Sequence, residues 1–274
     1  MRINHVLGAL TIAVAVLLPS HQAAAHAFWV NLADYYLNEA GESTRAYIGW
    51  GHRVPADEAL DADRLDQYAL VAPDGSCADL MPNPGGFLVA QVRCDTTGPH
   101  VVTASRVPGF FTVWEEGGET RYGAVPMTGL ENVASSSYNE MYGKALLGVQ
   151  AHGEDDFTTP VGAVLEVVPL KNPATLSPGP ASARPALPVQ VLFRGEPRPG
   201  AEISATYVGF STGLEYAQST ETDADGKAAF EMSTGGIWIV HAFTSTELRE
   251  DFQGKAHGEN YHATLTFEMP RFSE

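Results

Sequence analysis

The chain has 274 residues, of which 44% are hydrophobic and 18% are charged. The first value allows a large buried core, and the second argues against a disordered acidic tail. The 33 acidic residues outnumber the 16 basic ones, which gives a formal net charge of −17. A surface of this sign repels phosphate backbones and anionic lipids, so we expect neither a nucleic-acid partner nor electrostatic binding to membranes.

The N-terminus has the three parts of a secretion signal. Arg2 supplies a positive charge, residues 6–18 form an apolar run, and residues 23–25 are small alanines suited to cleavage. A membrane-spanning helix needs about 20 apolar residues, so this run is too short to cross a bilayer. We predict a signal peptide over residues 1–25, no transmembrane segment in the mature chain, and a periplasmic location.

Two cysteines, Cys77 and Cys94, each follow a strand-like segment. In an oxidising compartment we expect them to pair as a disulfide between neighbouring strands. A two-thiolate metal site is the alternative, but the chain lacks the closely spaced Cys and His pairs of zinc sites.

Short β-prone segments recur along the whole chain and are separated by Gly, Pro, Asn and Asp. This spacing is typical of β-sandwiches. The pattern changes near residue 160, where a second set of strand-like segments begins. We therefore predict a mainly β protein with two antiparallel sandwich domains, over residues 26–159 and 160–274.

One amphipathic helix is predicted in the first domain, over residues 137–149. Ser137 and Glu140 match a capping box at its start. The residues that recur at helical spacing and predict one apolar face are Tyr138, Met141, Tyr142, Ala145, Leu146 and Val149. We interpret this face as core packing.

His26 is the most informative histidine because it follows the predicted cleavage point. If cleavage follows Ala25, the free α-amine and the imidazole of His26 can chelate one metal ion together. A second imidazole would complete a three-nitrogen site of the histidine-brace kind, which suits Cu, Ni or Co. The small residues Ala25 and Ala27 also permit cleavage after Ala27, which would remove His26.

His52 is the predicted second ligand. It ends the motif Gly49-Trp50-Gly51-His52 just after a strand-like segment, where the glycines permit close approach of the backbone. Five carboxylates in the following loop would attract cations: Asp57, Glu58, Asp61, Asp63 and Asp66. The alternative is a solvated loop in which His52 is a turn residue.

His262 is a candidate third metal ligand on the polar side of the last predicted strand. It reaches a metal only if that side abuts the first domain. His241 shares strand parity with Ile237 and Ile239, which favours a core histidine over a ligand. The sequence has no G-x-S-x-G or H-E-x-x-H motif, so we predict no catalytic residues and no enzyme activity.

Six segments spread in order along the mature chain are His26–Leu32, Ala46–His52, Pro82–Phe87, Tyr142–Leu146, Leu187–Phe193 and Ala263–Glu268. In this order they resemble a bacterial periplasmic family, the domain of unknown function 4198, associated with the periplasmic component of nickel or cobalt uptake. The resemblance implies an exported metal-handling protein of β-sandwiches, the second one like an immunoglobulin or transthyretin module. It also implies an N-terminal histidine and a Gly-His pair, matched here by His26 and Gly51-His52. Ala27 departs from the more polar or bulkier residue expected at that position.

These observations predict a non-enzymatic periplasmic protein that binds a divalent metal, Ni or Co with Cu as an alternative, and presents it to a membrane uptake transporter. His26 and His52 would bind the ion, with His262 or His241 as a third ligand. Three alternatives stay open: an envelope interaction module without metal, a copper carrier, and a copper-dependent oxidative enzyme.

Overall fold

The structure is a computed structural model that describes residues 26–81, 87–154, 156–176, 184–211 and 215–270. Within these ranges the chain forms strands and three short 3-10 helices, so the predicted mainly β class is confirmed. The predicted signal peptide lies outside the described residues. The strands are β1 (Ala27–Leu32), β2 (Tyr36–Leu37), β3 (Ser43–Gly51), β4 (Leu65–Val71), β5 (Cys77–Asp79), β6 (Ala90–Arg93), β7 (Gly98–Glu116), β8 (Glu119–Gly123), β9 (Val133–Val149), β10 (Leu165–Pro169), β11 (Ala186–Phe193), β12 (Glu196–Pro197), β13 (Glu202–Tyr207), β14 (Gln218–Glu221), β15 (Lys227–Glu231), β16 (Gly236–Thr246) and β17 (Gly258–Met269). The 3-10 helices are η1 (Ala62–Arg64), η2 (Pro173–Thr175) and η3 (Glu250–Phe252).

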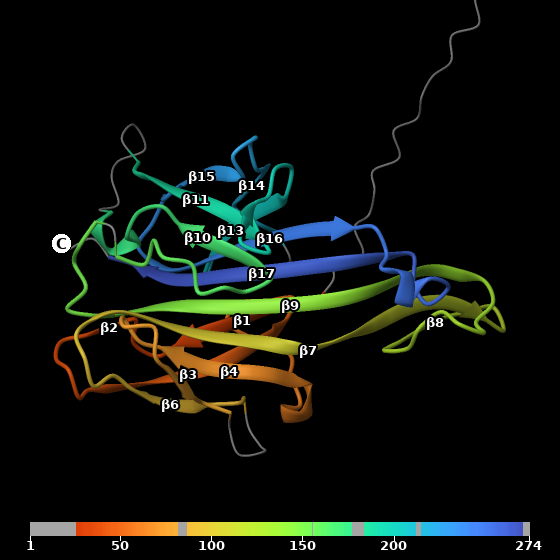
Figure 1. The fold of residues 1–274 in the computed structure, drawn as a ribbon, viewed down its shortest axis with the longest axis horizontal. Helices are drawn as coiled ribbons and strands as arrows, with labels where there is room; N and C mark the ends of the chain where they lie inside the picture. The colour runs from red at the N-terminus through yellow and green to blue at the C-terminus, as the bar shows by residue number, and fades with distance from the viewer. Residues whose placement is uncertain (1–25, 82–86, 155, 177–183, 212–214, 271–274) are drawn as a thin grey trace, which may run out of the picture.

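Three sheets pack as three layers (Figure 1). The central sheet has ten strands in the path β14-β13-β16-β17-β9-β7-β4-β5, with β2 on β9 and β8 on β7. The sheet β1-β3-β6 covers one face, and the sheet of β10, β11, β12 and β15 covers the other. Two apolar cores fill the spaces between these layers.

The central sheet joins the two halves of the chain. The last strand, β17, pairs in parallel with β9, from Gly258 opposite Ser137 to Thr266 opposite Ala145. Strands from both halves therefore share one continuous sheet, and the expected pair of separate sandwiches is not confirmed. The boundary placed near residue 160 stays a prediction.

The helix predicted over residues 137–149 is wrong, because this segment belongs to strand β9. Side chains that fell at helical spacing alternate between the two cores. Met141 and Ala145 pack in the core beneath β1 and β3, whereas Tyr142 and Leu146 contact the core beneath β10 and β11. A strand covered on both faces bears apolar residues on both, so its pattern also fits a helical face.

The predicted disulfide is absent, because both cysteines are free thiols. Cys77 begins β5 at the edge of the central sheet and is exposed, whereas Cys94 follows β6 in the three-stranded sheet and is fully buried. The two residues thus belong to different layers. Burial raises the pKa of the Cys94 thiol to about 11, which keeps it protonated.

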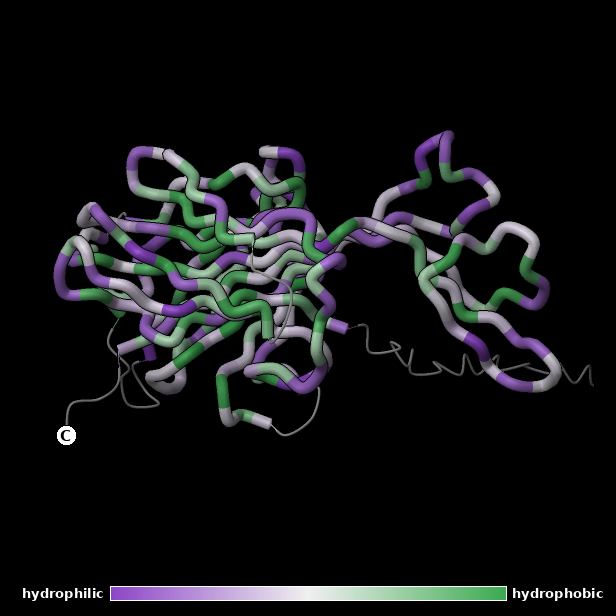
Figure 2. The backbone as a smooth tube through the Cα atoms, turned by 90° about the horizontal axis from the view of Figure 1, so that it is seen from below, coloured by the Kyte–Doolittle hydropathy of each residue, from purple (hydrophilic) through white to green (hydrophobic). Residues whose placement is uncertain are grey.

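Two long strands extend the molecule sideways. The outer parts of β7 and β9 leave the layered body and form an arm with β8 (Figures 1 and 2). In the part of the chain that the structure describes, no helix has the length and apolar character needed to cross a bilayer.

A buried ion pair connects two layers and provides a test of the packing. Lys144 Nζ on β9 lies 2.5 Å from Glu166 Oε1 on β10, and the side chains are 6% and 2% exposed. Glu166 also accepts the backbone N–H groups of Val161 and Gly162, each at 2.9 Å. Its carboxylate therefore holds the segment that enters β10.

We expect Lys144→Met to lower the free energy of unfolding by about 3–5 kcal/mol, because it leaves the Glu166 charge buried without its cation. Urea denaturation measures this change. The control is Arg93→Met, which removes an exposed ion pair with Asp95 and should cost under about 1 kcal/mol. Equal losses in the two variants would contradict the prediction.

Candidate metal centre

The register of β1 and β3 brings His26 and His52 together. The strands run antiparallel with Ala27 opposite Gly51. His26 precedes Ala27 and His52 follows Gly51, so the two histidines are the next facing pair beyond the ladder. Their ring centroids lie 4.2 Å apart, with the planes inclined by 45°. The structure thus places the two predicted metal ligands side by side at one end of the small sheet.

Glu58 adds a carboxylate to this pair. Its Oε1 and Oε2 each lie 3.0 Å from Nε2 of His26, and Oε1 lies 3.5 Å from Nδ1 of His52. One ligand atom from each residue lies within 4.8 Å of the other two. A search of the described residues for three or more metal-ligating side chains close enough to hold one ion finds His26, His52 and Glu58.

A closed loop holds Glu58 against the end of β3. The backbone N–H groups of Asp57 and Glu58 donate to the carbonyl of Trp50 at 3.4 and 3.2 Å. Asp57 Oδ1 accepts the N–H of His52 at 2.8 Å. Gly51 has φ +116°, and a Cβ there would lie 2.0 Å from Asp57 Oδ1. Glycine is therefore required at this position to let the loop close. The spacing of five loop carboxylates does not reveal this closure, so sequence reasoning did not single out Glu58.

The tip of the same loop is anchored on β1. The carbonyl of Pro55 accepts Trp29 Nε1–H at 2.8 Å and Asn31 Nδ2–H at 3.0 Å. A Cβ on Gly49 would lie 2.0 Å from Trp29 Nε1, so glycine clears space for this indole. The two glycines before His52 thus make room for different neighbours: Gly49 for Trp29 on β1, and Gly51 for Asp57 in the loop.

An aromatic stack orients His26 while leaving the site open. The His26 ring lies parallel to Trp50, with centroids 4.9 Å apart and an interplanar angle of 9°. The side chains of His26, His52 and Glu58 are 36%, 26% and 45% exposed. Solvent therefore reaches all three side chains.

The ring nitrogen of His26 that faces Glu58 is Nε2. An amine chelate would use Nδ1, because Nδ1 is the nitrogen within reach of the α-amine of the same residue. In this ring orientation His26 offers Nε2 to the cluster, and the group of three side chains forms without the amine.

His262 lies with His241 and outside the group of His26, His52 and Glu58. Its strand face does abut the first half of the chain, since Thr264 Oγ1 donates to the carbonyl of Phe28 at 2.9 Å. However, Nδ1 of His262 lies 3.2 Å from Nε2 of His241. Burial lowers the pKa of His262 to about 3 and that of His241 to about 4, so both rings are neutral near pH 7.

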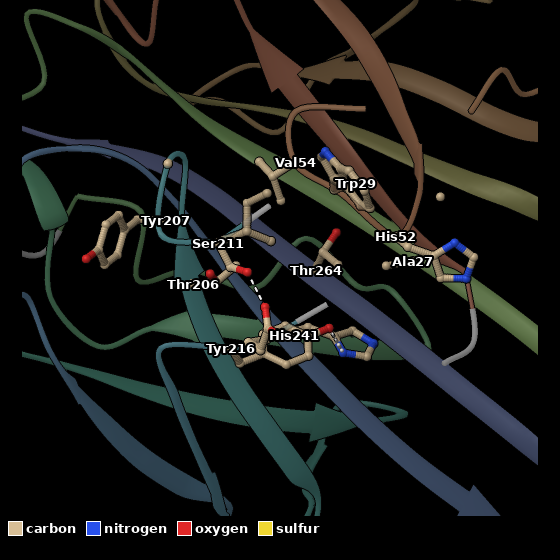
Figure 3. Close-up of a pocket in the computed structure, with 14 residues that line it drawn as sticks. Ala27, Trp29, His52, Val54, Thr206, Tyr207, Ser211, Tyr216, His241 and Thr264 are labelled. Carbon is tan, nitrogen blue, oxygen red and sulfur yellow. Dashed lines mark hydrogen bonds between the residues drawn. The ribbon is translucent and has the colours of Figure 1, made fainter. Parts of the chain in front are cut away.

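A cleft separates the two histidine clusters. His52 and Trp29 line one side, and His241 and Tyr216 line another, with Thr264 in the wall between them (Figure 3). The empty space of this cleft is about 630 Å³, including its open mouth. One histidine of each cluster, His52 and His241, thus faces the same solvent-connected space.

We expect acid to destabilise the fold through His241 and His262. Their folded pKa values lie below the usual value of about 6.5, so the unfolded chain binds more protons between these values. The free energy of unfolding should be retained above about pH 6.5 and fall as the pH decreases toward 4. Urea denaturation across this range measures the slope.

The double variant His241→Asn/His262→Asn should lose much of this slope. His257→Asn, which changes an exposed histidine, should retain it. Identical acid sensitivity in the wild type and the double variant would show that these two rings are not responsible.

Comparison with known proteins gives solved structures of low similarity and one family. No curated protein matched the chain. The D00-D0 domain of intimin is 11% identical, with 89% of this chain and 99% of that chain covered and a TM-score of 0.21. Fibronectin(III)-like modules of Clostridium thermocellum CbhA are 9% identical, with 88% and 94% covered and a TM-score of 0.22. A Salmonella alpha-2-macroglobulin variant is 11% identical over 88% of this chain and 14% of its own, with a TM-score of 0.21. These scores carry no functional argument.

Residues 23–246 match the family described as Domain of unknown function (DUF4198), and the chain belongs to that family.

Proposed function

We propose that this protein binds a divalent transition-metal ion through His26, His52 and Glu58 and acts as a carrier. The proposal rests on the approach of two imidazoles and one carboxylate to within 4.8 Å of one another. Imidazole nitrogens suit Ni, Co, Cu and Zn, and the carboxylate offsets part of the charge of a divalent ion. The residues present therefore fit such an ion.

The proposed ligand atoms are Nε2 of His26, Nδ1 of His52 and a carboxylate oxygen of Glu58. They come from the start of β1, the end of β3 and the loop that closes on Trp50. His262 has no part in this set. The partial exposure of all three side chains supports reversible loading, as expected of a carrier that takes up an ion and releases it.

Which metal ion is bound is a separate question from which residues bind it. The same donors favour Cu(II) over Ni(II) and Co(II) in intrinsic affinity, so the ligand set does not select the metal. Nickel or cobalt is proposed from the resemblance to the periplasmic component of uptake systems, with export, a periplasmic location and a membrane transporter as partner. The family itself is described only as a domain of unknown function.

Calorimetry on the exported, processed protein tests the site with Ni(II), Co(II) and Cu(II). We expect one ion per chain, and a loss of affinity of roughly tenfold or more for His52→Ala and for Glu58→Gln. Asp61→Asn is the matched control, because Asp61 is an exposed carboxylate of the same loop outside the cluster. No binding by the processed protein would instead favour a metal-free interaction module.

A second measurement separates the two ways in which His26 can bind. Intact mass first establishes whether the processed chain begins at His26. A chain with one extra glycine before His26 moves the α-amine away from the ring but keeps the three side chains. Retained affinity would support the side-chain cluster, whereas loss of binding would support an amine chelate and a turned His26 ring.

A further inference from the structure

The register of β16 and β17 brings His241 and His262 into contact. His241 lies opposite Thr264, and His262 is two residues from Thr264 on the same strand. Residues in this diagonal relation share a face of the sheet and lie within reach of long side chains. The rings are nearly parallel, with centroids 5.4 Å apart and an interplanar angle of 9°. Two imidazoles thus meet on the face that abuts β1.

The groups in direct contact with the pair are neutral. Tyr216 Oη lies 3.2 Å from Nδ1 of His241, on the opposite side of the ring from His262. The ring of Phe243 lies 5.0 Å from that of His262. Within the described ranges, the hydrogen-bond partners of the two rings are each other and Tyr216. His262 is 8% exposed, and His241 opens onto the cleft.

We propose that His241 and His262 form a second metal site, which binds monovalent copper through Nε2 of His241 and Nδ1 of His262. These atoms are 3.2 Å apart. Two nitrogens bonded at about 2.0 Å to one ion are about 3.3 Å apart at a tetrahedral angle, which is close to this separation. The site needs no carboxylate from the first cluster and stands independently of the function proposed there.

The charge of the ion follows from the donors. Two neutral imidazoles do not offset the charge of a divalent ion, and burying uncompensated charge is costly. A monovalent ion carries the smaller desolvation cost in such a place. Copper suits imidazole ligands, and it has a stable monovalent state.

Binding requires only a shift of one proton within one of the two rings. Each neutral ring has one N–H, and one of these protons now lies between the two nitrogens. If that proton is on Nε2 of His241, it moves to Nδ1 of the same ring when the ion binds, and Tyr216 Oη accepts the hydrogen bond. If it is on Nδ1 of His262, it moves to Nε2 of that ring. Tyr216 would therefore fix the metal-binding tautomer of His241. No proton is gained or lost overall.

The cleft provides access to this pair. His241 and Tyr216 line it on one side, and it is open to solvent (Figure 3). The cleft therefore leads to the side chain of His241, on the face opposite the apolar core of β16 and β17.

The test uses the full processed chain with the first cluster removed, as His26→Ala/His52→Ala. Under anaerobic reducing conditions, Cu(I) is titrated in competition with bicinchoninate, a chromogenic Cu(I) chelator. We expect this variant to retain one Cu(I) per chain. Adding His262→Asn should lower the affinity roughly tenfold or more, whereas adding His257→Asn should leave it unchanged. Failure of the first proposal does not affect this result, because the first site is absent throughout.

Two results would overturn the second site. One is no Cu(I) retained by His26→Ala/His52→Ala, and the other is equal affinity with and without His262→Asn. If the triple variant does not fold, histidine ring signals in the NMR spectrum of His26→Ala/His52→Ala decide the matter. Cu(I) should shift the signals of His241 and His262 and leave that of His257 in place, and unshifted signals of the pair would refute the site.

Discussion

The coverage of strand β9 on both faces is the constraint on which the rest of the structure depends. Ala145 and Leu147 pack toward β1 and β3, and Leu146 packs toward β10 and β11. Because β9 also pairs with β7 and β17, it binds the N-terminal strands, the C-terminal strands and both outer sheets at once. The buried ion pair of Lys144 and Glu166 lies in this contact between layers. Separate sandwiches would leave these faces exposed, so the shared sheet is the arrangement that buries them.

This packing also positions both histidine clusters. A Cβ on Gly143 would lie 3.3 Å from the Phe28 ring, the Thr264 hydroxyl and the Trp29 Cα, so β1 approaches the seam of β9 and β17 closely. The hydrogen bond from Thr264 to Phe28 fixes the contact. The end of β1 is thereby held near the polar face of β16 and β17. The β1–β3 register then brings His26 next to His52, and the β16–β17 register brings His241 next to His262.

Local patterns in the sequence predicted the strand content and the approach of His26 to His52. Glycine and proline spacing indicated many short strands, and the Gly-His motif after a strand indicated a strand end. The pairing of β9 with strands from both halves depends on contacts distant in sequence, so its apolar residues were misread as a helix. For the same reason, alternation put His241 with core residues and His262 on the polar side of its strand, and it did not predict that the two rings meet on one face of the sheet. Glu58 joins the cluster because its loop closes onto Trp50, and no spacing of residues in the sequence predicts that closure.

The two clusters differ in burial and charge in a way that separates the ions suited to each. The first has a carboxylate and is 26–45% exposed, so water and Glu58 can both offset a divalent charge. The second has only neutral nitrogens, one of them on the 8% exposed ring of His262. Placing a divalent ion there would remove most of its hydration without supplying an anion. Charge compensation, more than the number of imidazoles, would therefore distinguish the ions that we propose for these two clusters.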